Sequence, residues 1–337
     1  MTKRQVTIKD IAREVGVSPA LVSFVMSNVV AGEPVYRVSR ETSKRILEVA
    51  ARLNYKPNNS ARALRSGRTG TIGVVLSDIA NPFFAEIARY LEDHAYKYDY
   101  NVIFGSSDEN PEKFARVISV LLNKGVDGLI LVPCDGSEKT IREVVESGVN
   151  TVLLDRVVPD LEVSSVVLDN REAARCLTEK ILARGARRID MVSYSMNISN
   201  TRDRERGYLD AMAAAGLEQN THIERVGHNN YGSLPEYVHI ARKRGVDGFM
   251  IATNTLASLV IAEINKNRFR IPGDFQVACF DRNPLFDIYE SGIIYASQPV
   301  DMFASKALEI VMSHIRGKSS NTALTAERVV LSSEINE

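Results

Sequence analysis

The spacing of apolar residues divides the chain into two regions with different periods. Over residues 7–53, apolar side chains recur every three or four positions, which is the period of short amphipathic helices. From residue 71 onward, runs of consecutive apolar residues alternate with longer stretches of helical period. Because such runs are typical of buried parallel strands, the second region predicts an α/β fold.

The start of the first region predicts two helices joined by a tight turn. Thr7 and Asp10 resemble a capping box, and apolar residues at helical spacing follow Thr7. Gly16 can take the left-handed conformation that ends this helix. Ser18 can then cap a second helix, and Pro19 suits its first turn.

The second helix and a third one are expected to complete a small all-α head. Leu21, Val22 and Val25 should point back at the first helix. A third helix is predicted from Arg40 to Leu53 behind the cap residue Ser39, and its inner stripe consists of Ile46, Val49, Ala50 and Leu53. Helix, glycine turn and helix form the helix-turn-helix plan, whose second helix enters the DNA major groove. The alternative is a plain three-helix bundle.

Charge is distributed unevenly along a chain whose net charge is zero. Residues 1–70 hold 13 Lys or Arg against 5 Asp or Glu, whereas the remaining residues hold 29 against 37. A basic segment attached to a mildly acidic body is the electrostatic pattern of a nucleic-acid-binding head on a larger module. The pattern favours the DNA-binding interpretation of the three helices.

The body alternates predicted strands with amphipathic helices. Strands are expected at "TIGVVLSDI", "YNVIFGS", "VDGLILVP", "NTVLLD", "RIDMVSYS", "HIERVGH", "VDGFMIAT" and "FQVACFD". The segment "KGVDGLILVP" at 124–133 is similar to "RGVDGFMIAT" at 244–253. This near-repeat predicts two similar lobes. Two lobes imply a cleft, and ligands of parallel sheets bind beyond the carboxyl ends of the strands.

Two aspartates directly follow predicted strands. Asp155 comes after "NTVLL" and Asp281 after "FQVACF", so each carboxylate is placed at a strand end, where it can accept hydrogen bonds from sugar hydroxyls. The segment "NPFF" adds Phe83 and Phe84 for stacking on a ligand or lining its site, although Phe83 suits a core position equally well. These four residues are the first candidates for a small-molecule site.

Several protein classes are disfavoured by what the sequence lacks. No apolar run approaches the roughly 18 residues of a membrane span, and no signal peptide is visible, so we expect a cytoplasmic protein with no membrane partner. The three cysteines are scattered, which argues against disulfides and against a zinc site. Dinucleotide, P-loop, hydrolase and HExxH signatures are absent, so we expect neither an enzyme nor a cofactor or metal.

The segments "TIKDIAREVGVSPALVSFVMSN" and "LNYKPNNSARALRSGRTGTIGVVL" resemble the DNA-binding head and hinge of the LacI/GalR bacterial transcription regulators. The resemblance extends over the whole chain. In that family the residue after the V-S pair is usually an arginine that contacts guanine, whereas this chain has Phe24. Phe24 can pack on a thymine methyl group, or it can pack inside the head. The resemblance and the pattern together place these residues of the head at DNA: Thr7, Ser18, Pro19, Ala20, Ser23, Phe24 and Asn28.

The resemblance also assigns the segment after the head. In the family this segment is a hinge helix that folds on contact with DNA and inserts a leucine in the minor groove. The matching residue is Leu64, with Arg62, Arg65 and Arg68 as phosphate contacts. The alternative is a disordered linker throughout.

In the body the resemblance adds further effector residues. The family aspartate that contacts the effector matches Asp281 in "CFD", and the R-x-x-G element in "RDRERGYLDAM" makes Arg204 an anchor. The family commonly has an aspartate where this chain has Asn254. The expected effector site therefore consists of Phe83, Phe84, Asp155, Arg204, Asn254 and Asp281.

These inferences predict a helix-turn-helix head at 1–57, a hinge helix and linker at 58–70, and a body at 71–337. The body is expected to be periplasmic-binding-protein-like, with two doubly wound parallel sheets: an N-lobe at about 71–168 and 300–337, and a C-lobe at about 169–299. We expect a homodimeric regulator that binds double-stranded operator DNA under control of a small-molecule effector, a sugar or sugar derivative. The alternative is a solute-binding protein of the same fold without a regulatory role.

Overall fold

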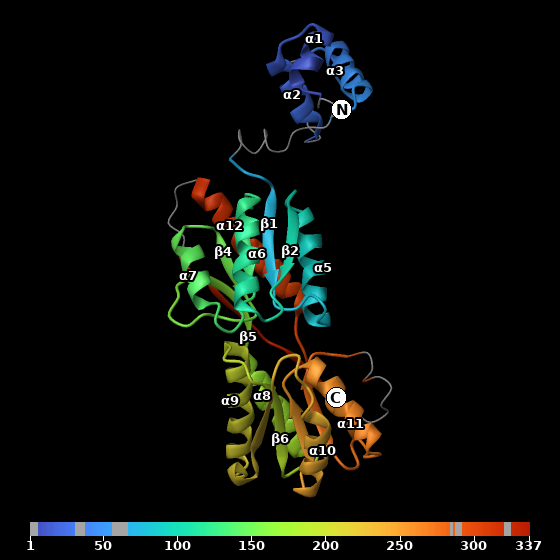
Figure 1. Cartoon of the computed structure of the whole chain (residues 1–337), viewed down its shortest axis with the longest axis vertical. Helices are drawn as coiled ribbons and strands as arrows, with labels where there is room; N and C mark the ends of the chain where they lie inside the picture. Colours follow the sequence, from blue (N-terminus) through green and yellow to red (C-terminus); the bar gives the residue numbers. More distant parts are fainter. Residues whose placement is uncertain (1–5, 31–37, 56–66, 284–285, 287–291, 320–324) are drawn as a thin grey trace. The chain divides into compact units, whose positions relative to one another are not determined.

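The computed structural model describes residues 6–30, 38–55, 67–283, 286, 292–319 and 325–337. The chain divides into two compact units, Met1–Thr69 and Gly70–Glu337 (Figure 1). The first unit contains the helices α1 (Ile8–Val15), α2 (Pro19–Val30) and α3 (Arg40–Arg52). The second unit contains two sheets and the helices that cover them.

The three helices of the first unit begin at the residues that the pattern indicates, and α3 ends at Arg52, one residue before the predicted Leu53. The backbone N–H of Thr7 donates to Asp10 Oδ2 over 2.9 Å, at the start of α1. Gly16 ends α1 with a φ of 80°. The hydroxyl of Ser18 accepts from Leu21 N at 3.2 Å, and that of Ser39 accepts from Thr42 N at 3.0 Å, so α2 and α3 both start at side-chain caps.

A small apolar core holds the three helices together. Each helix contributes fully or nearly fully buried side chains, and the buried set consists of Ile11, Ala12, Val22, Val25, Ile46, Val49 and Ala50. Leu21 differs from the prediction, because it is only half-buried while Val22 and Val25 face the core. Phe24 is 37% exposed and so lies outside this core.

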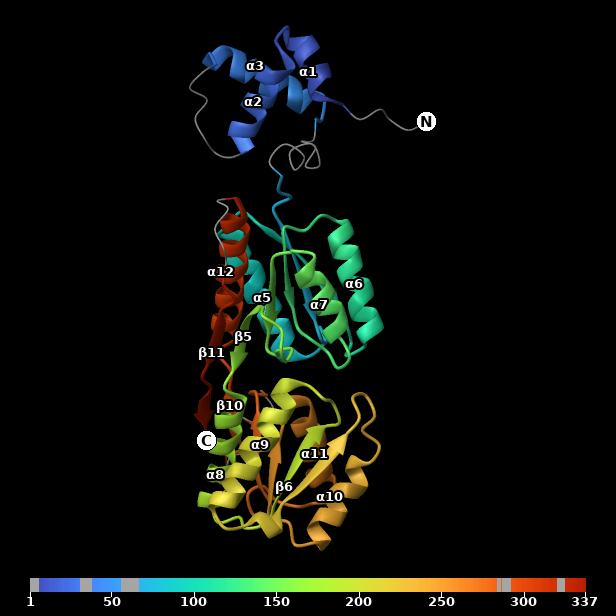
Figure 2. The same ribbon diagram turned by 90° about the vertical axis from the view of Figure 1, so that its left-hand side faces the viewer.

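The first lobe of the second unit is a six-stranded sheet in which every pair is parallel, in the order β11-β5-β4-β3-β1-β2. Its strands are β1 (Thr71–Leu76), β2 (Asn101–Ser106), β3 (Gly128–Leu131), β4 (Thr151–Leu154), β5 (Ser164–Leu168) and β11 (Arg328–Leu331). Its helices are α5 (Pro82–Tyr96), α6 (Pro111–Asn123), α7 (Glu138–Glu146) and α12 (Val300–Ser319). Helix α12 packs on α5 and on β3, β4 and β5, as Figures 1 and 2 show.

The second lobe has the corresponding strand order β12-β10-β9-β8-β6-β7, in which every pair is parallel except β10 and β12. Its strands are β6 (Ile189–Tyr194), β7 (His222–Val226), β8 (Gly248–Ile251), β9 (Gln276–Phe280), β10 (Ile294–Ser297) and β12 (Glu334–Asn336). Its helices are α8 (Asn170–Ala183), α9 (Ser199–Ala214), the short 3-10 helix η1 (Glu218–Asn220), α10 (Leu234–Lys243) and α11 (Asn254–Lys266). The shared strand order explains the near-repeat in the sequence.

The end of the chain departs from the predicted lobe boundaries. Strand β12 pairs antiparallel with β10, so the last residues belong to the second sheet, whereas 300–337 were expected in the first lobe. Among the described strands, β5, β10, β11 and β12 were not predicted. With Ile335 as its only apolar residue, the three-residue β12 gives no periodic signal.

Candidate functional site: a cleft between the two lobes and an exposed helix

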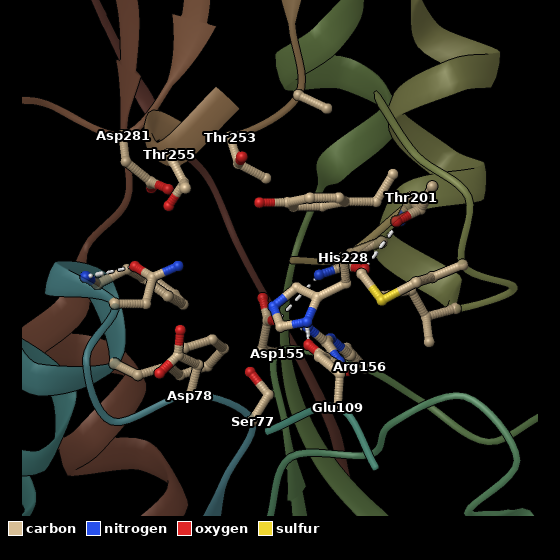
Figure 3. A pocket seen from close by; sticks show the side chains of 18 of the residues that line it. Ser77, Asp78, Glu109, Asp155, Arg156, Thr201, His228, Thr253, Thr255 and Asp281 are labelled. Atoms are coloured by element: carbon tan, nitrogen blue, oxygen red, sulfur yellow. Dashed lines mark hydrogen bonds and ion pairs between the residues drawn. The ribbon is translucent and has the colours of Figure 1, made fainter. Parts of the chain in front are cut away.

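A pocket opens between the carboxyl ends of the strands of the two lobes (Figure 3). Its volume is about 690 Å³, which includes space that is open to solvent. In Figure 3, Asp78 and Glu109 of the first lobe lie opposite Thr253, Thr255 and Asp281 of the second. This is the position at which parallel α/β sheets bind ligands.

Asp155 and Asp281 occupy equivalent places in the two lobes. Asp155 follows β4 with a φ of 65°, and Asp281 follows β9 with a φ of 66°. Their backbone N–H groups donate to Val166 O at 2.9 Å and to Ala296 O at 3.0 Å, on the next strand in each case. Left-handed backbone is uncommon outside glycine, although aspartate tolerates it better than most residues. The conformation turns each carboxylate toward the cleft.

The Asp155 carboxylate is buried and only partly bonded. Asn200 Nδ2 of α9 donates to its Oδ2 at 2.9 Å, and Arg156 Nε lies 3.3 Å from the same oxygen. Its Oδ1 is buried without a hydrogen-bond partner among the described residues. Burial raises the pKa of this carboxyl, and the nearby guanidinium groups of Arg156 and Arg204 oppose the rise.

Asp281 faces the cleft from the second lobe. Gln298 Nε2 donates to its Oδ1 at 2.7 Å. Burial raises the pKa of Asp281 to about 6, while the charge of Arg204 acts to lower it. The carboxyl therefore changes its charge within a pH range where an ordinary aspartate is fully ionised.

Arg204 is buried in α9 and held in one orientation by several groups. Its Nε donates to Asn170 Oδ1 at 2.7 Å, and its Nη1 donates to Ala252 O at 2.6 Å. The guanidinium lies 3.7 Å from the centre of the Phe280 ring. Nη2 makes no hydrogen bond to the described residues and remains available to a ligand. Burial lowers the pKa of Arg204.

Arg156 carries a second buried guanidinium, which sequence reasoning missed. Its Nη2 and Nη1 donate to the two carboxylate oxygens of Glu109 at 2.7 and 2.9 Å, which is a bidentate pair. Nη1 also donates to Pro133 O at 2.8 Å. The only sequence signal for Arg156 is its place directly after Asp155.

Aromatic side chains line both sides of the cleft. The Phe83 and Phe84 rings pack edge to face with their centres 5.0 Å apart, and Phe83 also contacts Phe303 at 6.0 Å. Both residues are almost fully buried, so each lines the pocket while also belonging to the first lobe's core. Tyr194 of the second lobe packs against His228 with their ring centres 5.6 Å apart.

Five of the six predicted effector residues line this pocket: Phe83, Phe84, Asp155, Arg204 and Asp281. Asn254 is not among the residues that line it. It is buried at the start of α11, where its Oδ1 accepts from the Thr255 hydroxyl at 3.3 Å, and the lining residues are Thr253 and Thr255 instead. Residues that line the pocket but were not predicted include Ser77, Asp78, Glu109, Arg156, Tyr194, Asn200, Thr201, His228, Tyr231 and Gln298.

The head residues predicted to contact DNA are mostly exposed. Among them Thr7, Ser18, Pro19, Ala20 and Phe24 are exposed and Ser23 is half-buried. Asn28 belongs to α2. The hinge residues Arg62, Leu64 and Arg65 lie outside the described residues, so their roles stay predictions.

Known proteins match both units of the chain. Residues 69–274 match the model of periplasmic binding proteins and the sugar-binding domain of the LacI family, and residues 7–58 match the model of bacterial regulatory proteins of the lacI family. Catabolite control protein A of Priestia megaterium is 30% identical over 322 residues, which cover 95% of both chains. The chain belongs to the LacI family. It is a DNA-binding transcriptional regulator, and its family is not one of enzymes.

Solved structures share the fold of this LacI-family regulator at low sequence identity. The lac repressor dimer bound to operator and an anti-inducer matches with a TM-score of 0.83 and 19% identity, over 99% of this chain and 98% of that one. The complex of the transcriptional regulator CelR with cellobiose matches with a TM-score of 0.70 and 22% identity, over 99% of both chains. These likenesses establish the helical head and the two parallel-sheet lobes.

The described residues contain neither a membrane-spanning helix nor a cluster of metal ligands. None of the described helices is both long and apolar enough to cross a membrane. Within the same ranges, no three His, Cys, Asp or Glu side chains gather as a metal site requires.

Proposed function

We propose that this regulator binds operator DNA as a homodimer and that a carbohydrate in the cleft between its lobes changes its operator affinity. The observation that carries the proposal is the group of Asp155, Asp281 and Arg204 at the carboxyl ends of the strands, beside aromatic rings. Carboxylates accept from sugar hydroxyls, the free Nη2 of Arg204 can donate to one, and aromatic faces suit the apolar side of a sugar ring. The cellobiose bound to CelR supports a carbohydrate.

The cleft is well placed to couple a ligand to the arrangement of the lobes. Contacts already cross it: Asn200 Nδ2 bonds to Asp155, the Ser199 hydroxyl accepts from Val157 N at 3.0 Å, and Asp135 Oδ2 accepts from Asn197 N at 3.1 Å. A ligand that bonds to both lobes stabilises one arrangement over others. Operator affinity then depends on the ligand if it depends on that arrangement.

A homodimer is the assembly that suits the head. A single short helix offers few base contacts, and paired heads read palindromic sites. Edge strand β2 and its surroundings expose apolar side chains that a second copy can cover, because Ile79 is 50% exposed, Tyr96 81% and Ile103 39%. In the proposed complex, Leu64 inserts into the minor groove while Arg62 and Arg65 contact phosphates.

Selection of binding sites from random DNA by the full chain tests the DNA-binding part of this proposal. We expect a palindromic motif of two half-sites, with log Kd rising steeply as salt concentration rises because lysines and arginines displace counterions from phosphates. A motif with a single half-site would argue against the dimer. Enrichment of no motif would argue against sequence-specific binding.

A further inference from the structure

The balance of charges in the cleft is acidic. The residues that line it include four carboxylates and two guanidinium groups: Asp78, Glu109, Asp155, Asp281, Arg156 and Arg204. No lysine lies among the described lining residues. The permanently charged cations that line it are therefore the two arginines.

Arg156 is not free to bind an anion. Glu109 takes both of its terminal nitrogens in the bidentate pair, and the side chains are only 6% and 7% exposed. The remaining nitrogen, Nε, is buried 3.3 Å from Asp155 Oδ2, with which it forms an ion pair but no hydrogen bond. The backbone at Asp108 and Glu109 has φ values of 51° and 56°, an uncommon conformation for two successive residues other than glycine. This turn places the Glu109 carboxylate on the guanidinium.

The positive charge of Arg204 is also offset by nearby carboxylates. The charges of both Asp281 and Asp155 act on its guanidinium, and two of its three nitrogens already bond to neutral oxygens. Burial raises the pKa of Asp155 and of Asp281, so negative charge at this position in the cleft is poorly stabilised by solvent. A phosphate group would add one or two further charges in a site poorly screened by water.

We propose that Glu109 is a specificity determinant that masks Arg156, so that the cleft takes an unphosphorylated polyhydroxylated ligand and rejects sugar phosphates. The inference rests on the proposed function of the cleft. A sugar hydroxyl can donate to the unpartnered Oδ1 of Asp155. A phosphate instead meets the carboxylates and finds only the single nitrogen Nη2 of Arg204, because the bidentate fork of Arg156 is taken by Glu109. The masking pair, and not the number of arginines, sets the class of ligand.

Calorimetric titration of the wild-type chain with paired ligands tests the class of ligand. The pairs are glucose, fructose, ribose and cellobiose, each against a phosphate ester of the same sugar. We expect the tightest ligand to be an unphosphorylated sugar that binds about tenfold or more tightly than its phosphate. A phosphate that binds as tightly as its parent sugar overturns the inference, and so does a chain that binds no member of either series.

The variant Glu109→Gln tests the residue. It leaves Arg156 with an uncompensated charge, so we expect the preference for the unphosphorylated member of a pair to shrink by about tenfold or more. Glu112→Gln is the matched control, because Glu112 is an exposed residue in the first turn of α6, and this variant should keep the preference. An undiminished preference in Glu109→Gln overturns its role. If Glu109→Gln does not fold, the wild-type titration still decides the class of ligand.

The outcomes separate the inference from the proposed function. If a sugar phosphate is the tighter ligand and changes operator affinity, the function stands and the inference fails. If an unphosphorylated sugar binds without changing operator affinity, the ligand class stands and the proposed regulation fails.

Discussion

Among the exposed residues of α2, Phe24 is the one that we expect to affect the DNA specificity of the head most. It stands where similar heads carry a guanine-reading arginine, and 37% of its surface is exposed on α2. The sequence left open whether the ring packs inside the head. The core of the head is filled without it, by residues such as Val22 and Val25. A ring on the outer side of α2 can contact a thymine methyl but cannot form the paired hydrogen bonds that arginine makes with guanine.

Replacing Phe24 by arginine should therefore change the DNA sequence that the head prefers. We expect Phe24→Arg to introduce a guanine preference at one position in each half-site, worth about 1–3 kcal/mol against other bases. Site selection from random DNA for both forms measures this. Phe24→Leu keeps an apolar side chain and should retain the wild-type motif. An unchanged motif in the arginine variant would mean that residue 24 does not face the bases.

Asp281 gives the body a pH dependence with a defined sign. In the unfolded chain an aspartate loses its proton near pH 3.9, whereas in the folded chain Asp281 keeps it until about pH 6. Between these values the folded state binds the extra proton, so this group's contribution to the free energy of unfolding falls as the pH rises. The contribution is constant above the folded-state pKa.

Urea denaturation of wild type and Asp281→Asn from pH 4 to pH 7 isolates that contribution. The asparagine variant cannot lose a proton, so its stability relative to wild type should increase by roughly 2–3 kcal/mol between pH 4 and pH 6 and then level off. A stability difference that is the same at every pH would show that burial does not raise the pKa of Asp281.

At the scale of elements, the close packing of α8 on α9 positions Arg204. Gly207, one turn after Arg204, faces α8 so closely that an added Cβ would lie 2.0 Å from the backbone oxygen of Arg171. The R-x-x-G spacing therefore combines Arg204, the anchor that we propose for the ligand, with the glycine that allows α9 to approach α8. The family resemblance predicted Arg204 as a site residue. The need for glycine at position 207 follows only from the packing of α9 against α8.

The substitution Gly207→Ala should thus destabilise the second lobe, although alanine is the better helix former. We expect a loss of about 1–3 kcal/mol from the forced separation of α8 and α9, measured by chemical denaturation. Gly232→Ala is the control, because nothing lies within 4 Å of its added Cβ, and its stability should stay within about 0.5 kcal/mol of wild type. A stabilised Gly207→Ala variant would contradict the close approach.

At the scale of the whole molecule, sequence reasoning found the fold but only part of the site. Continuous apolar runs identified the central strands, and the rule that ligands bind at strand ends identified Asp155 and Asp281. Strand β5 begins with Ser164 and Ser165, so only three consecutive apolar residues remain to indicate a buried strand, and it was not predicted. Glu109 could not be predicted, because its ion-pair partner Arg156 lies 47 positions away along the chain. Its left-handed backbone conformation also has no sequence motif.

Operator affinity with and without sugar, for wild type and Arg204→Ala, tests the central claim that the cleft controls DNA binding. The ligand is the sugar that binds tightest in the calorimetric series. In wild type we expect it to change operator affinity by about tenfold or more. Arg204→Ala should keep the sugar-free operator affinity and lose the response, whereas Arg206→Ala, an exposed change on the same helix, should keep both. A wild-type chain without a response, or an Arg204→Ala variant with a full one, would contradict the account.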